Sequence, residues 1–89
     1  MNVVIDNRLQ EDEGCLELLG VMGLEVPSIH VIYIDCRLDD LDYELDELIA
    51  RVYAKCVDRK ADLFIGLDGI ASKMRELKIN AVSLNVGEI

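Results

Sequence analysis

Apolar runs and helical stripes alternate along the chain. Four runs of β-branched and aliphatic residues predict strands, at 3–6, 29–35, 63–67 and 81–86. Their apolar residues are largely continuous instead of alternating with polar ones, which is typical of strands buried on both faces of a sheet. The segments between them predict helices at 9–22, 41–56 and 72–77.

The segment 41–56 gives the clearest helical signal, because its apolar residues recur at the helical period and would form one stripe. That stripe consists of Leu41, Leu45, Leu48, Ile49, Val52, Tyr53 and Cys56. Acidic residues crowd the start of the segment and basic residues its end, an arrangement that complements the helix dipole. A weaker stripe in the segment 9–22 consists of Leu9, Leu16, Leu19 and Met22.

Strands that alternate with helices through short links predict an α/β fold. Parallel neighbours need crossover connections, and right-handed crossovers place helices on both faces of the sheet. We therefore expect a small three-layer sandwich with a four-stranded, mainly parallel sheet of Rossmann-like type. The length of 89 residues suits one domain spanning 1–89.

The formal charge of −9 narrows the choice of partners. Proteins that bind nucleic acid over a broad surface use clusters of Lys and Arg, which this acidic chain lacks overall. Most basic residues fall in the second half, where a local basic face could form. No apolar stretch reaches the roughly 18 residues that cross a bilayer, and no secretory signal is visible, so we expect a cytoplasmic protein without a membrane partner.

Cysteine and histidine usage argues against a zinc site. Cys15, Cys36 and Cys56 are widely spaced and odd in number, so we expect buried free thiols in a reducing compartment. His30 is the only histidine and lies within an apolar run, which places it in the expected core. Zinc sites use Cys and His at short spacings that this chain does not have.

Three of the expected strands end at or next to an aspartate. Asp6 and Asp35 lie in the related sequences IDNRL (5–9) and IDCRL (34–38), and Asp68 follows the run LFIGL. The carboxyl ends of parallel strands share one edge of the sheet, where open α/β sheets bind ligands. Clustered carboxylates favour a cation, and oxygen ligands suit Mg²⁺ or Mn²⁺. All three aspartates are therefore candidate metal ligands, although each could instead form a turn or cap the next helix.

A fourth acid comes from the start of the segment 41–56. Asp46 lies on the flank of its apolar stripe, from which a carboxylate could reach the edge of the sheet. The alternative is a solvated acid in the first helical turn, where negative charge stabilises a helix.

The order of these motifs resembles that of a known family. VVIDNRL (3–9) ends a strand on an acid and a polar residue, and LGVMGLEV (19–26) follows. Residues 44–84 then supply an acidic helix start, an apolar strand that leads to Asp68, and a short helix. Over nearly its whole length the chain resembles the small PIN-like nuclease domains, distant relatives of toxin-type PIN ribonucleases.

The resemblance implies a ribonuclease that uses Mg²⁺ or Mn²⁺ to hydrolyse the phosphodiesters of RNA. Asp6 and Asp68 would be catalytic metal ligands, and Asp46 would assist them. In such enzymes a pair of ions activates water and stabilises the leaving oxygen. The chain departs from the family pattern at two positions, since no Glu follows Asp6 and Ile70 stands where a second Asp is common.

A non-catalytic binding module on the same sheet is the alternative. Its ligand would be a nucleotide-like small molecule or a basic protein, and assembly of several copies stays open. Asn7, Gly66 and Gly69 would then allow a ligand to approach the backbone closely. A glycine-rich phosphate-binding fingerprint is absent, because GLDG is too short to form one.

Overall fold

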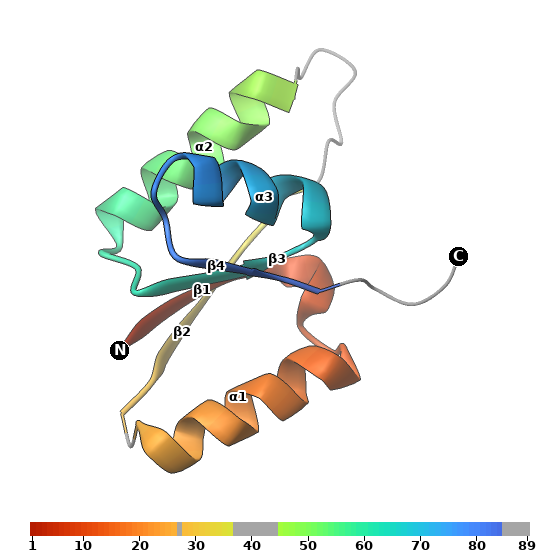
Figure 1. Cartoon of the computed structure of the whole chain (residues 1–89), viewed down its shortest axis with the longest axis vertical. Helices are drawn as coiled ribbons and strands as arrows, with labels where there is room; N and C mark the ends of the chain where they lie inside the picture. Colours follow the sequence, from red (N-terminus) through yellow and green to blue (C-terminus); the bar gives the residue numbers. More distant parts are fainter. Residues whose placement is uncertain (27, 37–44, 85–89) are drawn as a thin grey trace.

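The computed structural model describes residues 1–26, 28–36 and 45–84, which form a single sheet with helices on either side (Figure 1). The strands are β1 (Asn2–Asp6), β2 (His30–Ile34), β3 (Leu63–Gly66) and β4 (Ala81–Ser83). The helices are the short 3-10 helix η1 (Asn7–Leu9) and the α-helices α1 (Glu13–Glu25), α2 (Leu45–Asp58) and α3 (Asp68–Glu76).

All strand pairs in the sheet are parallel, and the strand order is β2-β1-β3-β4. The predicted α/β class with a four-stranded sheet is therefore confirmed. The chain first places β2 on one side of β1 and then crosses to the other side for β3 and β4. Strand β1 consequently lies inside the sheet, and the described strands β2 and β4 lie at its two edges.

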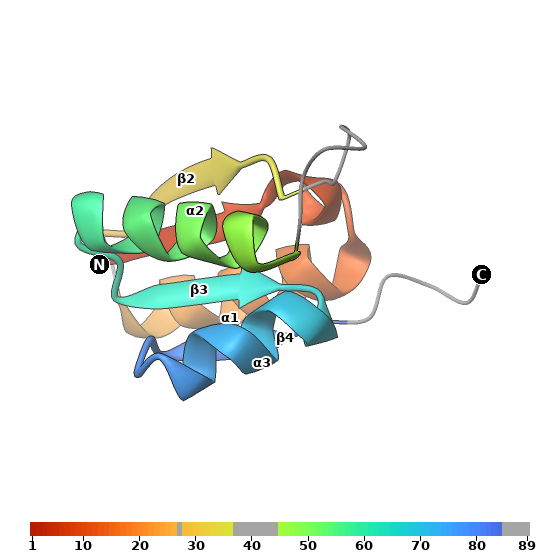
Figure 2. The ribbon, with the colours of Figure 1, turned by 90° about the horizontal axis from the view of Figure 1, so that it is seen from above.

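Alternate residues of the central strands fill two separate cores. Val4 and Phe64 face α2 and α3, where they meet Leu48, Val52 and Met74. On the other face of the sheet, β1 and β3 pack against α1, and the residues in this core include Val3, Ile5, Leu63, Ile65 and Cys15. Figures 1 and 2 show the resulting three layers, with α1 alone on one face and α2 and α3 together on the other.

Helix α1 begins later than the sequence predicts, and one residue of its predicted apolar stripe lies outside the core. The Asp12 carboxylate accepts a hydrogen bond of 3.1 Å from the Cys15 N–H and caps the helix at this point. Cys15 is buried, whereas Leu16, which the predicted stripe included, is 51% exposed. The predicted stripe was therefore wrong at Leu16, whereas Leu9 is buried and Leu19 and Met22 pack against the core as predicted.

Helix α2 follows the predicted stripe over its described part. Leu48, Val52 and Cys56 are buried and Ile49 packs against them, while Tyr53 lies at the margin of the stripe and is 37% exposed. Leu41 lies outside the described residues. Helix α3 begins at Asp68, four residues before the predicted start, and β4 is described as far as Ser83.

The three cysteines are buried free thiols, as predicted. Burial raises the pKa of Cys36 to about 12 and that of Cys56 to about 11, so both stay protonated at neutral pH. The prediction for His30 was wrong, because this residue is exposed at the start of the edge strand β2. None of the described helices has the length and apolar character to cross a membrane.

The burial of Leu48 gives a test of the helix phase. Replacing Leu48, which is 2% exposed, with Ala should lower the free energy of unfolding by about 2–5 kcal/mol, because a cavity replaces buried methyl groups. The neighbouring Glu47 is exposed, and Glu47→Ala should change stability by less than about 0.5 kcal/mol. Urea denaturation measures both, and equal losses would contradict this packing.

Candidate functional site

The parallel sheet brings the ends of three adjacent strands to one edge. Asp6 is the last residue of β1 and pairs with Ile34, so that Asp35 follows one residue beyond the end of β2. Asp68 follows β3, which is the neighbour of β1 on its other side, and opens α3. The topology thus places the predicted residues Asp6, Asp35 and Asp68 at the carboxyl edge, as expected for strand ends of a parallel sheet.

Asp6 is fully buried, and both of its carboxylate oxygens are bound by Arg8. The guanidinium Nε lies 3.1 Å from each oxygen, and Nη2 lies 2.6 Å from Oδ2. The Arg8 backbone N–H also donates a 2.9 Å bond to Oδ1, so Asp6 caps the 3-10 helix η1 as well. This bidentate geometry is the strong form of an arginine–carboxylate pair.

Arg8 supplies the positive charge that the buried carboxylate requires. Its side chain is 33% exposed, and its Nη2 also donates to the Cys36 carbonyl at 3.4 Å. The hydrogen bonds to Asp6 raise the pKa of Arg8 above its ordinary value, so the guanidinium stays charged. Asp6 therefore has a structural function at the end of β1, and its charge is compensated within the chain.

The other predicted site residues lie on the surface. Asp35 is exposed after β2, Asp68 is exposed in the first turn of α3, and Asp46 is exposed in the first turn of α2. Asp68 is not the cap of α3, since Leu67 occupies that position and makes no side-chain capping bond. Among the residues that the structure describes, no three His, Cys, Asp or Glu side chains form a group that could hold a metal ion.

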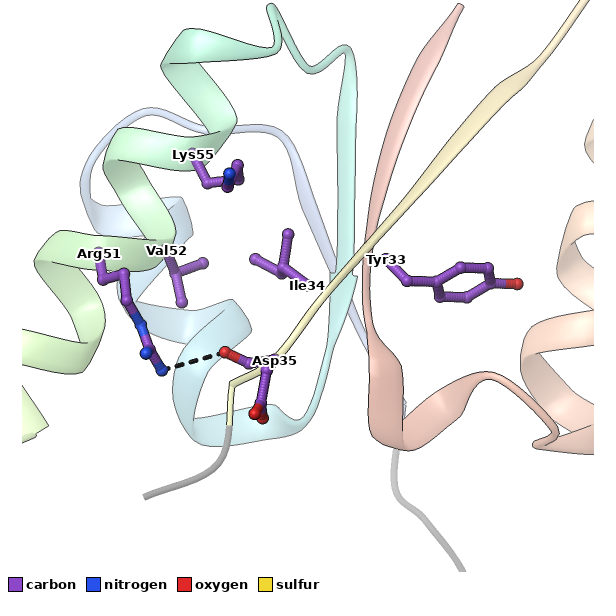
Figure 3. Close-up of a pocket in the computed structure, with 6 residues that line it drawn as sticks. All are labelled: Tyr33, Ile34, Asp35, Arg51, Val52 and Lys55. Atoms are coloured by element: carbon purple, nitrogen blue, oxygen red, sulfur yellow. Dashed lines mark hydrogen bonds between the residues drawn. The ribbon is translucent and has the colours of Figure 1, made fainter. Parts of the chain in front are cut away.

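A different arrangement lies where the edge strand β2 meets α2. A pocket of about 310 Å³ is lined there by Tyr33, Ile34, Asp35, Arg51, Val52 and Lys55. Figure 3 shows Arg51, Val52 and Lys55 on α2 beside the end of β2, with Arg51 reaching toward Asp35, while the ring of Tyr33 points to the opposite side of β2. A second hollow of about 270 Å³ on α2 shares Arg51 and Lys55 with the first.

The pocket combines cationic groups with apolar walls. Arg51 and Lys55 are one helical turn apart, so their side chains lie on the same flank of α2. The Arg51 Nη2 donates a 3.0 Å hydrogen bond to the Asp35 carbonyl, which holds the guanidinium beside the end of β2 (Figure 3). No ion pair involving Lys55 is found in the described part of the chain. Asp35 also lines the pocket at the end of β2, so the positive charge of the pocket lies on the α2 side, where Arg51 and Lys55 favour an anionic group.

The sequence prediction did not assign a function to Arg8, Arg51 or Lys55. Arg8 stands two residues after Asp6, and the shared IDxRL pattern marks it as a local partner for the carboxylate. Its counterpart Arg37 lies outside the described residues. The four-residue spacing of Arg51 and Lys55 beside the apolar stripe was a visible signal of a basic flank on α2.

The glycines predicted to face a ligand have different surroundings. A Cβ on Gly66 would lie 2.5 Å from the ring of Phe64, so packing within the protein requires glycine at this position. A Cβ on Gly69 would meet nothing within 4 Å. Asn7 begins η1 directly after Asp6, and its carbonyl accepts a 3.2 Å bond from the Gln10 N–H.

Comparisons of the chain with protein-family models, with curated proteins and with solved structures found no match. The functional conclusion therefore depends on the residues and geometry described above.

Proposed function

We propose that this domain is a non-catalytic binding module that recognises an anionic group in the pocket between β2 and α2. One observation carries the proposal: Arg51 and Lys55 line a pocket with the apolar residues Ile34 and Val52 and one carboxylate, Asp35, in a chain whose formal charge is −9. Arg51 and Lys55 give the pocket a local positive charge within a protein whose net charge is negative.

The size and chemistry of the pocket suit a small anion or one acidic group of a larger ligand. Its volume of about 310 Å³ is at the lower end of the range for ligand pockets, roughly 300–1,000 Å³. Val52 is buried, Ile34 is partly buried, and both belong to the apolar part of the lining. Arg51 offers a planar fork of donors and Lys55 a mobile point charge, which together suit carboxylate or phosphate oxygens.

Titration with pyrophosphate, followed by NMR of the backbone amides, tests the pocket. We expect shifts concentrated at residues 33–35 and 51–55, because these line the pocket. Lys55→Glu should weaken binding about tenfold or more, since a charge that attracts the ligand becomes one that repels it. The control is Lys73→Glu, which makes the same charge change on the exposed surface of α3 and should leave binding within about twofold.

Two results would contradict the proposal. Shifts spread evenly over the surface, without a response at residues 51–55, would show that the pocket does not bind the anion. Equal weakening by Lys55→Glu and Lys73→Glu would show that only the net charge of the protein matters.

The metal-dependent ribonuclease predicted from the PIN-like resemblance is a second candidate. The observation in its favour is topological, since Asp6, Asp35 and Asp68 follow three adjacent strands at one edge. The donor set does not fit the metal as it stands, because Arg8 binds both oxygens of Asp6 and the described acids form no group of three. We therefore derive no catalytic step from it.

Thermal unfolding with and without Mn²⁺ separates the two candidates. If Asp6 is held by Arg8, Mn²⁺ should leave the melting temperature of the wild type within about 1 °C, since a ligand stabilises only the state it binds. Asp68→Asn should then respond to Mn²⁺ in the same way as the wild type. A Mn²⁺-dependent rise that Asp68→Asn abolishes would instead support the ribonuclease and a metal site at this edge.

A further inference from the structure

The outer edge of β2 exposes backbone groups that the sheet does not use. The His30 N–H donates a 2.8 Å bond to the Met1 carbonyl, and β2 pairs with β1 from His30 to Ile34. Backbone groups of a strand point alternately to its two sides. His30, Ile32 and Ile34 therefore direct their N–H and C=O groups to β1, while Val31 and Tyr33 direct theirs outward.

In the described part of the chain, strand β2 shows none of the sequence features that usually protect an edge strand. Natural edges are blunted by Lys, Pro, bulges or very short strands, because an open edge is a template for another strand. The sequence HVIYI contains neither Lys nor Pro. Strand β2 pairs with β1 in continuous register over its full length of five residues, without a bulge. Among the described strands only β1 pairs with it.

The two faces of β2 differ in what they offer to an added strand. On the α2 face, Ile32 and Ile34 pack against the core. Ile34 also lines the pocket together with Arg51 and Lys55. On the other face, Val31 and Tyr33 are 38% and 40% exposed, because α1 does not cover this edge (Figure 2). An added strand would place alternate side chains on these two faces.

Resting on the proposed function, we infer that the ligand of the pocket is an extended acidic peptide that adds to the sheet alongside β2. Its backbone pairs with the outward groups of Val31 and Tyr33. Its acidic side chains lie on the α2 face beside Arg51 and Lys55, and its apolar side chains cover Val31 and Tyr33. The recognised sequence is therefore one in which acidic and apolar residues alternate, as in other cases of strand addition.

Arg51 sets the end of this pairing surface. Asp35 is the next residue whose carbonyl points outward, and the Arg51 Nη2 already donates to it at 3.0 Å. An added strand therefore pairs with Val31 and Tyr33 and stops beside the guanidinium, where an acidic side chain meets a fixed positive charge. Charge complementarity with α2 thus favours a peptide ligand with acidic residues over a second copy of this chain, which would bring Arg51 and Lys55 of both copies together.

The test uses a short blocked peptide of alternating valine and glutamate. Two control peptides replace glutamate with lysine, or replace the backbone amides with esters, which preserves charge and removes the hydrogen-bond donors. Binding is measured by NMR titration of the whole chain, and amide exchange is followed at Val31 and Tyr33. Ile32 is the internal control, because its N–H points to β1.

We expect the glutamate peptide to bind and to slow exchange at Val31 and Tyr33 by about tenfold or more, since both amides become hydrogen-bonded. The lysine peptide should not bind, and the ester peptide should bind about tenfold more weakly or worse. Lys55→Glu should weaken binding of the glutamate peptide, and Lys73→Glu should leave it unchanged.

Three results would overturn the inference, and they have different consequences. Pyrophosphate, the glutamate peptide and the ester peptide could all bind in a way that depends on Lys55 without slowing amide exchange at Val31 and Tyr33. In that case the anion pocket is supported and strand addition is not. If neither pyrophosphate nor the peptides bind, the proposed function fails as well. If exchange at Val31 and Tyr33 is already slow in the protein alone and depends on protein concentration, a second copy covers the edge.

Discussion

The ion pair between the buried Asp6 and the partly exposed Arg8 determines the charge at the carboxyl end of β1. Asp6 ends the inner strand β1 with no exposed surface, and a carboxylate in that position is strongly unfavourable unless its charge is compensated. Arg8 compensates it with bonds to both oxygens, and the same contact shapes the turn into η1. Open α/β sheets commonly bind ligands at this edge. Here the carboxylate at the end of β1 is already neutralised by Arg8.

The features that favour ligand binding lie instead at the outer side of the sheet. Two helices cover one face and α1 alone covers the other, so the edge strand β2 is less covered on the α1 side than β1 and β3 (Figures 1 and 2). On that strand, exposed apolar side chains, outward backbone groups and the cations of α2 occur together. The thinner cover on the α1 face thus explains why Val31 and Tyr33 are exposed along β2.

The fold was predictable because it depends on local patterns. Continuous apolar runs predicted the strands, and the stripe of α2 predicted the buried Leu48, Val52 and Cys56. The full buried face of α1 was harder to predict, because Leu16, Val21 and Leu24 make that helix apolar on its outer faces too. The exposure of His30 depends on β2 lying at an edge, and strand order is not encoded in any single segment.

The candidate site was harder to predict for a related reason. The positions of Asp6, Asp35 and Asp68 follow from parallel strands, but their environments depend on contacts between segments. Asp6 has its partner two residues away, whereas the pocket joins residues 33–35 to residues 51–55 across the chain. A strand-end aspartate therefore indicates an edge, and only the three-dimensional contacts show whether its charge is free to bind a ligand.

The most direct test of the account is a double-mutant cycle between Asp6 and Arg8. It uses Asp6→Asn, Arg8→Leu and the double variant, and the free energies of unfolding are measured in urea without divalent cations. Because Arg8 compensates the buried Asp6, we expect a coupling energy between the two residues of about 1–3 kcal/mol, above the roughly 0.2–1 kcal/mol of exposed ion pairs. A coupling near zero, with Asp6→Asn more stable than the wild type, would show that Arg8 does not satisfy Asp6 and that the carboxylate is available for another cation.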